Sequence, residues 1–313
     1  MSTDCNTQSD SSPYGTIADW VIKAEQVMQD AGLFFGHGTA TARDEACWMV
    51  SNTLRWPPDF DSGLFEQMLE AEQTQVLNEL LLKRVETRKP LAYLIDEAWF
   101  AGLRFKVNAD TLIPRSPLAE LIVDGMAPWL DFNQPLRVLE VGTGSGCIAA
   151  AMAWHWPNLQ IDASDISPAA LDLAQHNLDQ LQVSHRVRLI QADVFEGVGL
   201  SAKSRYDLII SNPPYVPQAS MWTLPREYQH EPDLALVAGK DGLDIVRRLV
   251  LGAPEFLNDD GWLVVEVGEA QPQAQAWLAD AEPLWLEFEH GGEGVFLMSR
   301  AACLNLGVTL ENQ

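Results

Sequence analysis

The amino-acid sequence predicts an α/β fold in which a doubly wound, mostly parallel sheet carries helices on both faces. From residue 137 onward, short apolar runs alternate with stretches of helical length, which is typical of parallel strands joined by crossover helices. The first of these runs leads directly into a glycine-rich segment, EVGTGSGC, at 140–147. Sheets of this kind bind ligands at the carboxyl ends of their strands, so the two observations together indicate a ligand-binding sheet.

A helical region precedes the sheet and spans residues 16–95. The segment 16–28 places its apolar side chains at helical spacing, at Ile17, Trp20, Val21, Ala24, Val27 and Met28. Residues 44–54 and 74–88 repeat this pattern. The region is therefore predicted to be a small helical domain.

The connection between the helical region and the sheet changes in character. Residues 98–115 are aromatic and β-branched with turn residues between them, which predicts a β-hairpin linker. A helix is expected over 116–130, with Ser116 as its N-cap and Pro117 as its first residue.

Seven strands are predicted in the sheet. Five apolar runs lie at 137–141, 160–166, 186–191, 206–211 and 262–268. Helices are expected at 146–156, from Pro168 after a Ser167 cap, at 242–257 and at 271–281. The last two strands, 284–289 and 294–300, are separated by only four residues, which fits an antiparallel hairpin and not a crossover.

Composition limits the class of protein. With 47% hydrophobic and 20% charged residues the chain is expected to be globular. No apolar run reaches the length that crosses a membrane, and the polar opening, 1–15, resembles a flexible tail and not a secretory signal. The four cysteines show no C-x-x-C spacing and the six histidines no metal-ligand spacing, which predicts reduced thiols, no metal site and a cytoplasmic location.

The charge excludes one class of partner. The formal net charge is −24, and both parts of the chain are acidic, since 1–95 hold 7 basic and 14 acidic residues and 96–313 hold 13 and 30. A duplex-DNA binder normally carries a basic surface, whereas this chain is expected to attract a basic partner. An alternative is that the acidity serves solubility alone.

The glycine loop favours one cofactor. Gly142, Gly144 and Gly146 allow a tight turn and close approach of the backbone to a ligand. A dinucleotide fingerprint needs glycine at 147, where Cys147 stands. The G-x-G-x-G spacing after Glu140 better suits S-adenosylmethionine, whose amine Glu140 is placed to receive.

Two further carboxylates follow predicted strands. Asp165 ends the second strand, where an acid can accept hydrogen bonds from both ribose hydroxyls. Asp193 ends the third and can take the adenine amino group, with Val194 and Phe195 placed to pack on the ring. Asp165 alone is equally well explained as a charge at a helix N-terminus; the agreement of three strand ends favours the ligand.

The fourth strand ends in SNPPY, residues 211–215. By itself the motif can be a stiff turn, because proline fixes φ and lacks an N–H. Next to a methyl donor, the Asn212 side chain and the Pro213 carbonyl can each accept a hydrogen bond from a planar NH2 group. Pro214 stiffens this arrangement and Tyr215 can stack on the group. Catalysis would rest on orientation and on stabilising positive charge at nitrogen, because asparagine is not a base at neutral pH.

Several motifs together resemble a known family: 112–122, 140–149, 211–216, 227–249 and 286–298. The C-terminal two thirds resembles class I S-adenosylmethionine-dependent methyltransferases, and residues 16–303 resemble the PrmB family of glutamine N5-methyltransferases. That family modifies a glutamine of large-subunit ribosomal protein L-three. PRSPLAE at 114–120 departs from the pattern of the sister family that acts on peptide-chain release factors.

The resemblance implies a seven-stranded Rossmann-like methyltransferase sheet and a division into five parts. These are a flexible tail (1–15), a helical substrate-recognition domain (16–95), a β-hairpin linker (96–117), an S-adenosylmethionine-binding methyltransferase domain (118–303) and a tail (304–313). The implied catalytic residues are Asn212, Pro213, Pro214 and Tyr215, and the implied cofactor-binding residues are Glu140, Gly142, Thr143, Gly144, Gly146, Asp165, Asp193, Val194 and Asn212.

The implied partner is a basic ribosomal protein, free or in an assembly intermediate, without direct DNA or membrane contact. An acidic enzyme would attract such a protein, and Glu227, Glu231 and Asp233 are placed to line its approach. Taken singly, each is equally well explained by a role as a helix cap or in a solvated loop. Two alternatives remain: an adenine-N6 nucleic-acid methyltransferase, which shares NPPY, and a non-catalytic assembly factor that keeps the fold.

Overall fold

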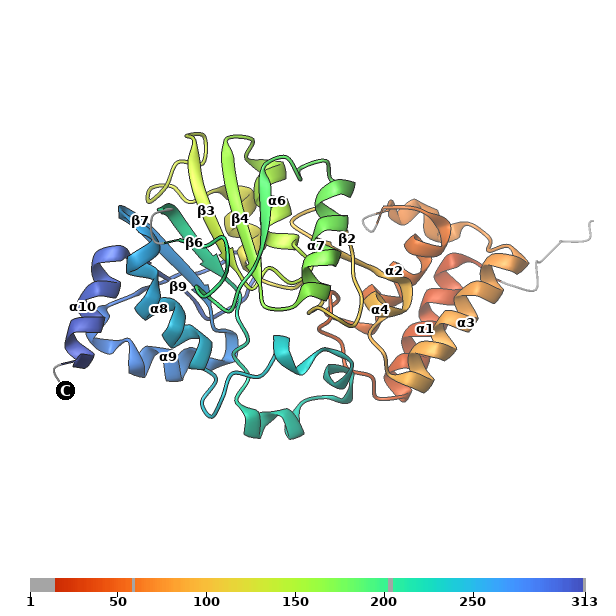
Figure 1. The fold of residues 1–313 in the computed structure, drawn as a ribbon. Coiled ribbons are helices and arrows are strands. Elements are labelled where there is room, and N and C mark those ends of the chain that lie inside the picture. Colours follow the sequence, from red (N-terminus) through yellow and green to blue (C-terminus); the bar gives the residue numbers. More distant parts are fainter. Residues whose placement is uncertain (1–14, 58–59, 202–204, 312–313) are drawn as a thin grey trace, which may run out of the picture. The chain divides into compact units, whose positions relative to one another are not determined.

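The computed structural model describes residues 15–57, 60–201 and 205–311, which form two compact units divided between Ile95 and Asp96 (Figure 1). The division falls where the sequence predicts the helical region to end. The predicted tail over 1–15 lies outside the described residues, except for Gly15.

The first unit is helical. Its elements are α1 (Ile17–Asp30), α2 (Ala42–Leu54), α3 (Ala71–Thr87), α4 (Leu91–Ile95) and a short 3-10 turn, η1 (Ser62–Glu66). Thr16 caps α1, because its hydroxyl accepts the Asp19 N–H at 3.2 Å while the Asp19 carboxylate accepts the Thr16 N–H at 2.8 Å. Of the apolar positions predicted for α1 all are buried except Val27, which is half-buried.

The second unit is built on the predicted seven-stranded sheet, in the order β5-β4-β3-β6-β7-β9-β8. The strands are β3 (Leu136–Val141), β4 (Leu159–Asp165), β5 (Val187–Gln191), β6 (Tyr206–Ser211), β7 (Leu257–Glu266), β8 (Leu284–Trp285) and β9 (Val295–Ser299). The strands β3 to β7 run parallel, and β9 pairs antiparallel with both β7 and β8. The prediction of a doubly wound, mostly parallel sheet with a closing hairpin is confirmed.

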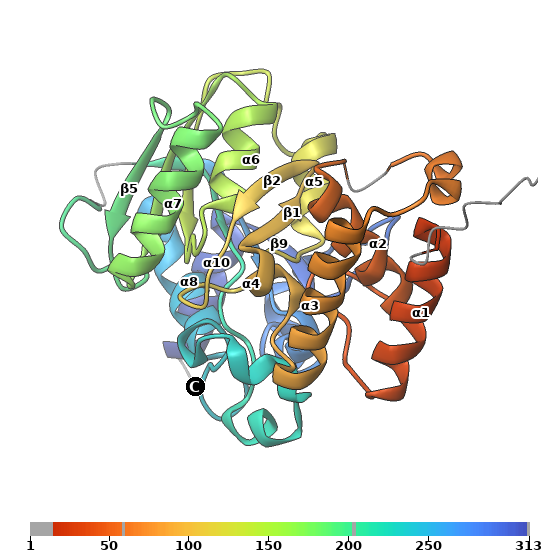
Figure 2. The ribbon, with the colours of Figure 1, turned by 90° about the vertical axis from the view of Figure 1, so that its right-hand side faces the viewer.

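Helices cover both faces of this sheet (Figures 1 and 2). One core forms beneath α5 (Leu118–Asp124), α6 (Cys147–His155) and α7 (Pro168–Gln180). The other forms beneath α8 (Asp244–Phe256), α9 (Gln271–Trp277) and α10 (Arg300–Glu311). Alanines of α6 are fully buried, which lets this helix lie close to the strands.

The hairpin β1 (Glu97–Phe100) and β2 (Leu103–Lys106) belongs to the second unit. Its two turn residues have positive φ, as a tight two-residue hairpin turn requires. Phe105 is buried in the α6 and α7 core, and the Asn177 amide group of α7 bonds both the N–H and the carbonyl of Lys106. The hairpin is therefore packed on the sheet domain and is not a free linker.

Several boundaries differ from the sequence prediction. The strand expected over 284–289 is limited to Leu284–Trp285, and the helix expected over 271–281 ends at Trp277. Residues 304–313 were expected to be a tail, but α10 continues to Glu311 because Cys303 and Leu306 are buried against the α8 face of the sheet. The helix expected over 116–130 begins at Leu118, with Pro117 and not Ser116 at the N-cap position, and ends at Asp124, where Gly125 takes φ +85° and stops it.

Candidate active site

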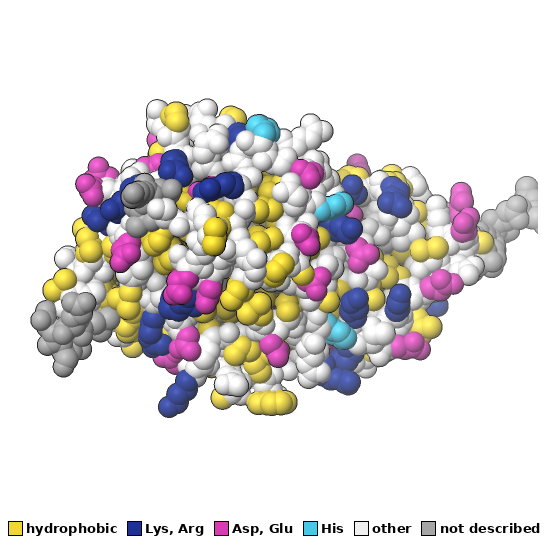
Figure 3. All heavy atoms as spheres, in the orientation of Figure 1, with side chains coloured by type: hydrophobic (Ala, Val, Ile, Leu, Met, Phe, Trp, Pro, Cys, Tyr) yellow, Lys and Arg dark blue, Asp and Glu magenta, His cyan; other side chains and the backbone are white. Residues whose placement is uncertain are grey.

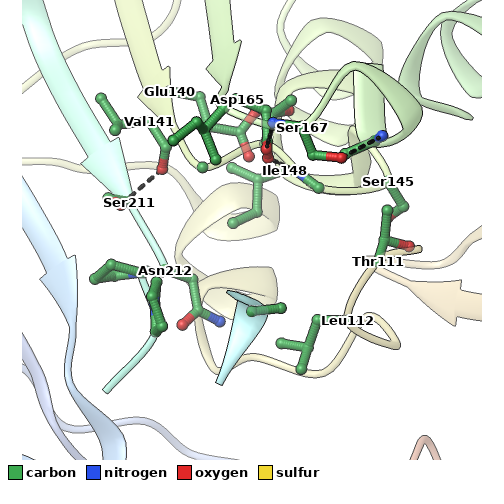
Figure 4. A pocket seen from close by; sticks show the side chains of 18 of the residues that line it. Thr111, Leu112, Glu140, Val141, Ser145, Ile148, Asp165, Ser167, Ser211 and Asn212 are labelled. Carbon is green, nitrogen blue, oxygen red and sulfur yellow. Dashed lines mark hydrogen bonds between the residues drawn. The ribbon is translucent and has the colours of Figure 1, made fainter. Parts of the chain in front are cut away.

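A cavity of about 360 Å³ lies at the carboxyl ends of the parallel strands (Figure 4). It opens where the strand order turns, since β4 lies on one side of β3 and β6 on the other, and this is the position at which doubly wound sheets bind ligands. Its walls are the glycine loop after β3, the residues that end β4 and β6, the segment after β5 and the segment 110–116. Its volume falls in the range of small-molecule sites.

The glycine loop wraps around the end of β4. Gly142, Gly144 and Gly146 all have positive φ, at 76°, 54° and 78°, a conformation that glycine adopts without steric cost. The backbone N–H groups of Gly142 and Thr143 donate to the Ser164 carbonyl at 2.8 and 2.9 Å. The loop is thereby fixed with its backbone against the cavity.

Glu140 lies beneath this loop and is 1% exposed. Its Oε2 accepts hydrogen bonds from the Thr143 hydroxyl at 2.6 Å and the Ala149 N–H at 3.0 Å. Its Oε1 is buried and meets no hydrogen-bond donor among the described residues. Burial raises the pKa of this carboxyl to about 7. A buried acceptor without a donor is costly, and a ligand amine would relieve that cost.

Asp165 ends β4 on the same side of the cavity, and Figure 4 shows it across the cavity from Asn212. Its two oxygens accept the Ser167 and Gly144 N–H groups at 2.9 and 2.8 Å. Burial nevertheless raises its pKa. Each oxygen keeps a lone pair, so the carboxylate is held in place and can still accept from a pair of hydroxyls.

Asp193 and Val194 also line the cavity. The Asp193 carboxylate accepts from the Arg248 guanidinium at 2.7 Å, and its carbonyl does so at 3.2 Å. Val194 is buried with φ +55°, a strained conformation for a β-branched residue. The expectation for Phe195 is wrong: its ring stacks on Phe256 at 4.6 Å and does not line the cavity.

The SNPPY segment continues directly from β6. The Ser211 hydroxyl donates to the Val141 carbonyl at 2.7 Å, which ties the strand end to β3. Asn212, Pro213 and Pro214 line the cavity. The Asn212 Oδ1 is buried, and no donor reaches it in the described part of the chain. A stiff turn alone gives no reason for such an oxygen.

Tyr215 faces a second cavity of about 200 Å³. Asn212 and Pro213 line both cavities, so this turn forms part of the wall between them. The Tyr215 hydroxyl donates to Glu266 Oε1 at 3.4 Å. Its ring lies where a side chain on Gly268 would have to be, since a Cβ there would approach the ring to 2.7 Å. A glycine at 268 therefore makes room for the tyrosine.

Three residues that hold these walls, Arg115, Ser116 and Glu266, were not predicted from the sequence to have a role in the site. The two terminal guanidinium nitrogens of Arg115 donate to Glu231 at 2.6 Å, and the Ser116 hydroxyl donates to Glu266. The partners stand 116 and 150 residues apart, so no local pattern could have paired them.

The structure corrects the expected acidic approach. Glu231 is 4% exposed and neutralised by Arg115, and Glu227 is fully buried. Asp233 alone of the three is exposed. Buried carboxylates serve the packing of the segment after SNPPY and do not present charge to a partner.

No group of three or more His, Cys, Asp or Glu side chains among the described residues is arranged to hold a metal ion. None of the helices in the described ranges is both long and apolar enough to cross a membrane.

Known proteins resemble this chain in sequence and in fold. Residues 125–224 match the model of the methyltransferase small domain. The fold is similar to the hMettl16 catalytic domain, solved in complex with MAT2A 3′UTR hairpin 1, with a TM-score of 0.52 and 15% identity over 80% of this chain and 91% of that one. At this identity the likeness concerns the fold alone.

Curated relatives are much closer. The ribosomal protein uL3 glutamine methyltransferase of Bordetella pertussis is 42% identical over 287 residues, which covers 91% of this chain and 95% of the relative. That of Xylella fastidiosa is 43% identical over 281 residues, which covers 90% and 89%. Identity at this level over nearly the full length shows that the chain belongs to the family of ribosomal protein uL3 glutamine methyltransferases.

Proposed function

We propose that the chain transfers a methyl group from S-adenosylmethionine to the side-chain amide nitrogen, N5, of a glutamine in ribosomal protein uL3. The observation that carries this proposal is the buried Asn212 Oδ1, which has no donor among the described residues and lies in the wall shared by two cavities. One cavity suits a cofactor and the other an incoming amide side chain.

The residues of the larger cavity fit this cofactor. S-adenosylmethionine supplies a methyl group on a positively charged sulfur, together with an amine, a ribose and an adenine. Glu140 would receive the amine, Asp165 the ribose hydroxyls, and Asp193 with Val194 the adenine. Gly142, Thr143, Gly144, Gly146 and Asn212 complete the proposed set, and all but Gly146 line the cavity. Gly146 is the N-cap of α6, and a side chain there would meet Ala174 of α7 at 2.9 Å.

The acceptor amide needs orientation more than activation. Its nitrogen lone pair is delocalised into the carbonyl, so it is a poor nucleophile. The Asn212 Oδ1 and the Pro213 carbonyl would each accept one N–H and turn the nitrogen toward the methyl group. Pro214 and Tyr215 would hold this geometry. Orientation of reactants can supply about 7–11 kcal/mol of the barrier, and acceptors aimed at the nitrogen stabilise its growing positive charge.

We further propose that the substrate is free uL3 or an assembly intermediate in the cytoplasm, and that the helical unit 16–95 contributes to its recognition. The net charge of −24 supports attraction to a basic protein and repulsion from RNA phosphate. Direct DNA binding has no support from this charge, which also weighs against an adenine-N6 activity.

The test incubates the protein and labelled S-adenosylmethionine with free uL3, assembled large subunits and duplex DNA in parallel. The acceptor is then located by mass spectrometry. We expect one methyl group on a glutamine of free uL3 and much less on assembled subunits. Label on adenine would establish the alternative activity. Equal labelling of free and assembled uL3 would contradict the preference for unassembled substrate.

A further inference from the structure

Glu266 is the last residue of β7 and is 3% exposed. It lines neither cavity. Because Val265 pairs with Ser211 in the parallel register of β6 and β7, Glu266 lies beside the start of the SNPPY turn. A carboxyl group buried this deeply is costly unless hydrogen bonds or an opposite charge compensate for the lost hydration.

The contacts of Glu266 join two walls of the active site. One oxygen accepts the Ser116 hydroxyl, and the other accepts the Tyr215 hydroxyl at 3.4 Å. A hydrogen bond from Asn212 also favours its ionised form. Ser116 belongs to the segment 110–116 that lines the larger cavity. A single carboxylate thus joins this segment to Tyr215 of the proposed acceptor site.

We infer that Glu266 is a positioning residue for methyl transfer, which acts through Tyr215 and Asn212 without touching the substrate. The inference rests on the proposed function. The Tyr215 hydroxyl has its donor role occupied by this carboxylate, which fixes the tyrosine beside the SNPPY turn, and Asn212 makes a weaker contribution to the same carboxylate. Loss of the carboxylate would leave the fold but release the acceptor geometry.

The ionised form of Glu266 is the one that holds this arrangement, since only a carboxylate accepts at both oxygens. The groups that face it are Ser116, Tyr215 and Asn212 as donors and Arg115 as the charged neighbour, which is itself bonded to Glu231. Its partner in the register with β9, Val295, is apolar. Burial raises the pKa of Glu266 to about 7. The rate should therefore fall as the pH is lowered through about 7.

The test compares Glu266→Gln with the wild type on free uL3, with cofactor affinity measured by calorimetry. We expect kcat to fall by about 10²-fold, as displacement of aligned groups typically causes, with cofactor Kd unchanged within about twofold. The loss of rate below about pH 7 should become smaller in the variant. In a double-mutant cycle with Tyr215→Phe, the second change should add little to the first, because both break one contact.

Asp162→Asn is the matched control. Asp162 is buried and lines neither cavity, and it accepts the Tyr206 hydroxyl at 2.6 Å and the Arg188 guanidinium at 2.7 and 2.8 Å. Its replacement should leave kcat unchanged. A folded Glu266→Gln protein with wild-type kcat, an effect confined to cofactor Kd, or full additivity with Tyr215→Phe would overturn the inference. A wild type that does not methylate uL3 would instead refute the proposed function.

Discussion

At the scale of single residues, the most informative atom is Asn212 Oδ1. A buried acceptor without a donor costs about 1–3 kcal/mol, and among the described residues Asn212 Oδ1 and Glu140 Oε1 both lie in the wall of one cavity without a hydrogen bond. Their shared location indicates that the cost is met by a ligand and not by the fold.

Asn212→Ala should therefore leave folding intact and remove turnover. We expect the rate to fall by about 10²–10³-fold, the usual effect of losing one electrostatic contact in a transition state, with cofactor affinity largely kept. Asn212→Asp keeps the acceptor but adds a charge near the sulfonium, which stabilises the ground state as well, so its rate should lie between those of alanine and wild type. Single-turnover assays on uL3 would show this; near-normal turnover of the folded alanine variant would reduce SNPPY to a turn.

The pKa of Glu140 leads to a prediction about pH. Its folded-state pKa is raised to about 7 by burial, so the group is neutral below that pH and ionised above it. A bound amine cation favours the ionised form. Cofactor affinity should rise with pH up to about 7, by at most about tenfold per pH unit for one released proton. Calorimetry on Glu140→Gln should show weaker binding without this slope, and an unchanged slope would assign it to another group.

At the scale of elements, α10 is a structural part of the sheet domain. Leu306 is 2% exposed and packs in the α8 core, whereas Leu304 on the same helix is 42% exposed. Leu306→Ala should lower the free energy of unfolding by about 2–5 kcal/mol, the usual range for a buried leucine, and Leu304→Ala should change it little. Urea titrations of the two variants provide the comparison. Equal, small effects would mean that α10 contributes little to stability.

Elements with a local signal could be predicted from the sequence. The parallel strands have apolar runs of the right length, and the Ser167 cap of α7 formed with its hydroxyl accepting the Ala170 N–H at 3.2 Å. The strand-end carboxylates also came together in one cavity. Helix α10 was missed although Cys303 and Leu306 have helical spacing, because two buried positions close to the end of a sequence give a weak pattern.

Contacts between distant segments could not be predicted. The Arg115–Glu231 and Ser116–Glu266 bonds join residues 116 and 150 positions apart. The burial of Glu231 depends on a fold that no local pattern describes. The position of Phe195 could not be predicted for a similar reason. An aromatic residue beside a ligand site and one in the core look alike in the sequence, and Phe195 packs in the core against Phe256.

At the scale of the whole molecule, the net charge of −24 is spread widely. Acidic and basic side chains are interspersed on the face drawn in Figure 3, and two of the three acids expected to attract the partner are buried. Attraction to a basic protein would therefore arise from the electric field of the whole molecule.

Association with free uL3 should slow steeply with salt, because the Debye length falls from about 10 Å at 0.1 M to about 3 Å at 1 M. Stopped-flow rates that do not depend on salt would leave solubility as the explanation for the charge.

The division of the chain at Ile95 has a consequence for heat capacity measurements. Both cavities are lined only by residues of the second unit. A ligand stabilises the part of a protein that binds it, by about 2.7 kcal/mol at 100 times its Kd. In a calorimetric scan, saturating cofactor should move the endotherm of residues 96–313 to higher temperature and leave that of the helical unit in place, so that one broad peak separates into two. A joint shift of the whole endotherm would mean that the two units unfold as one.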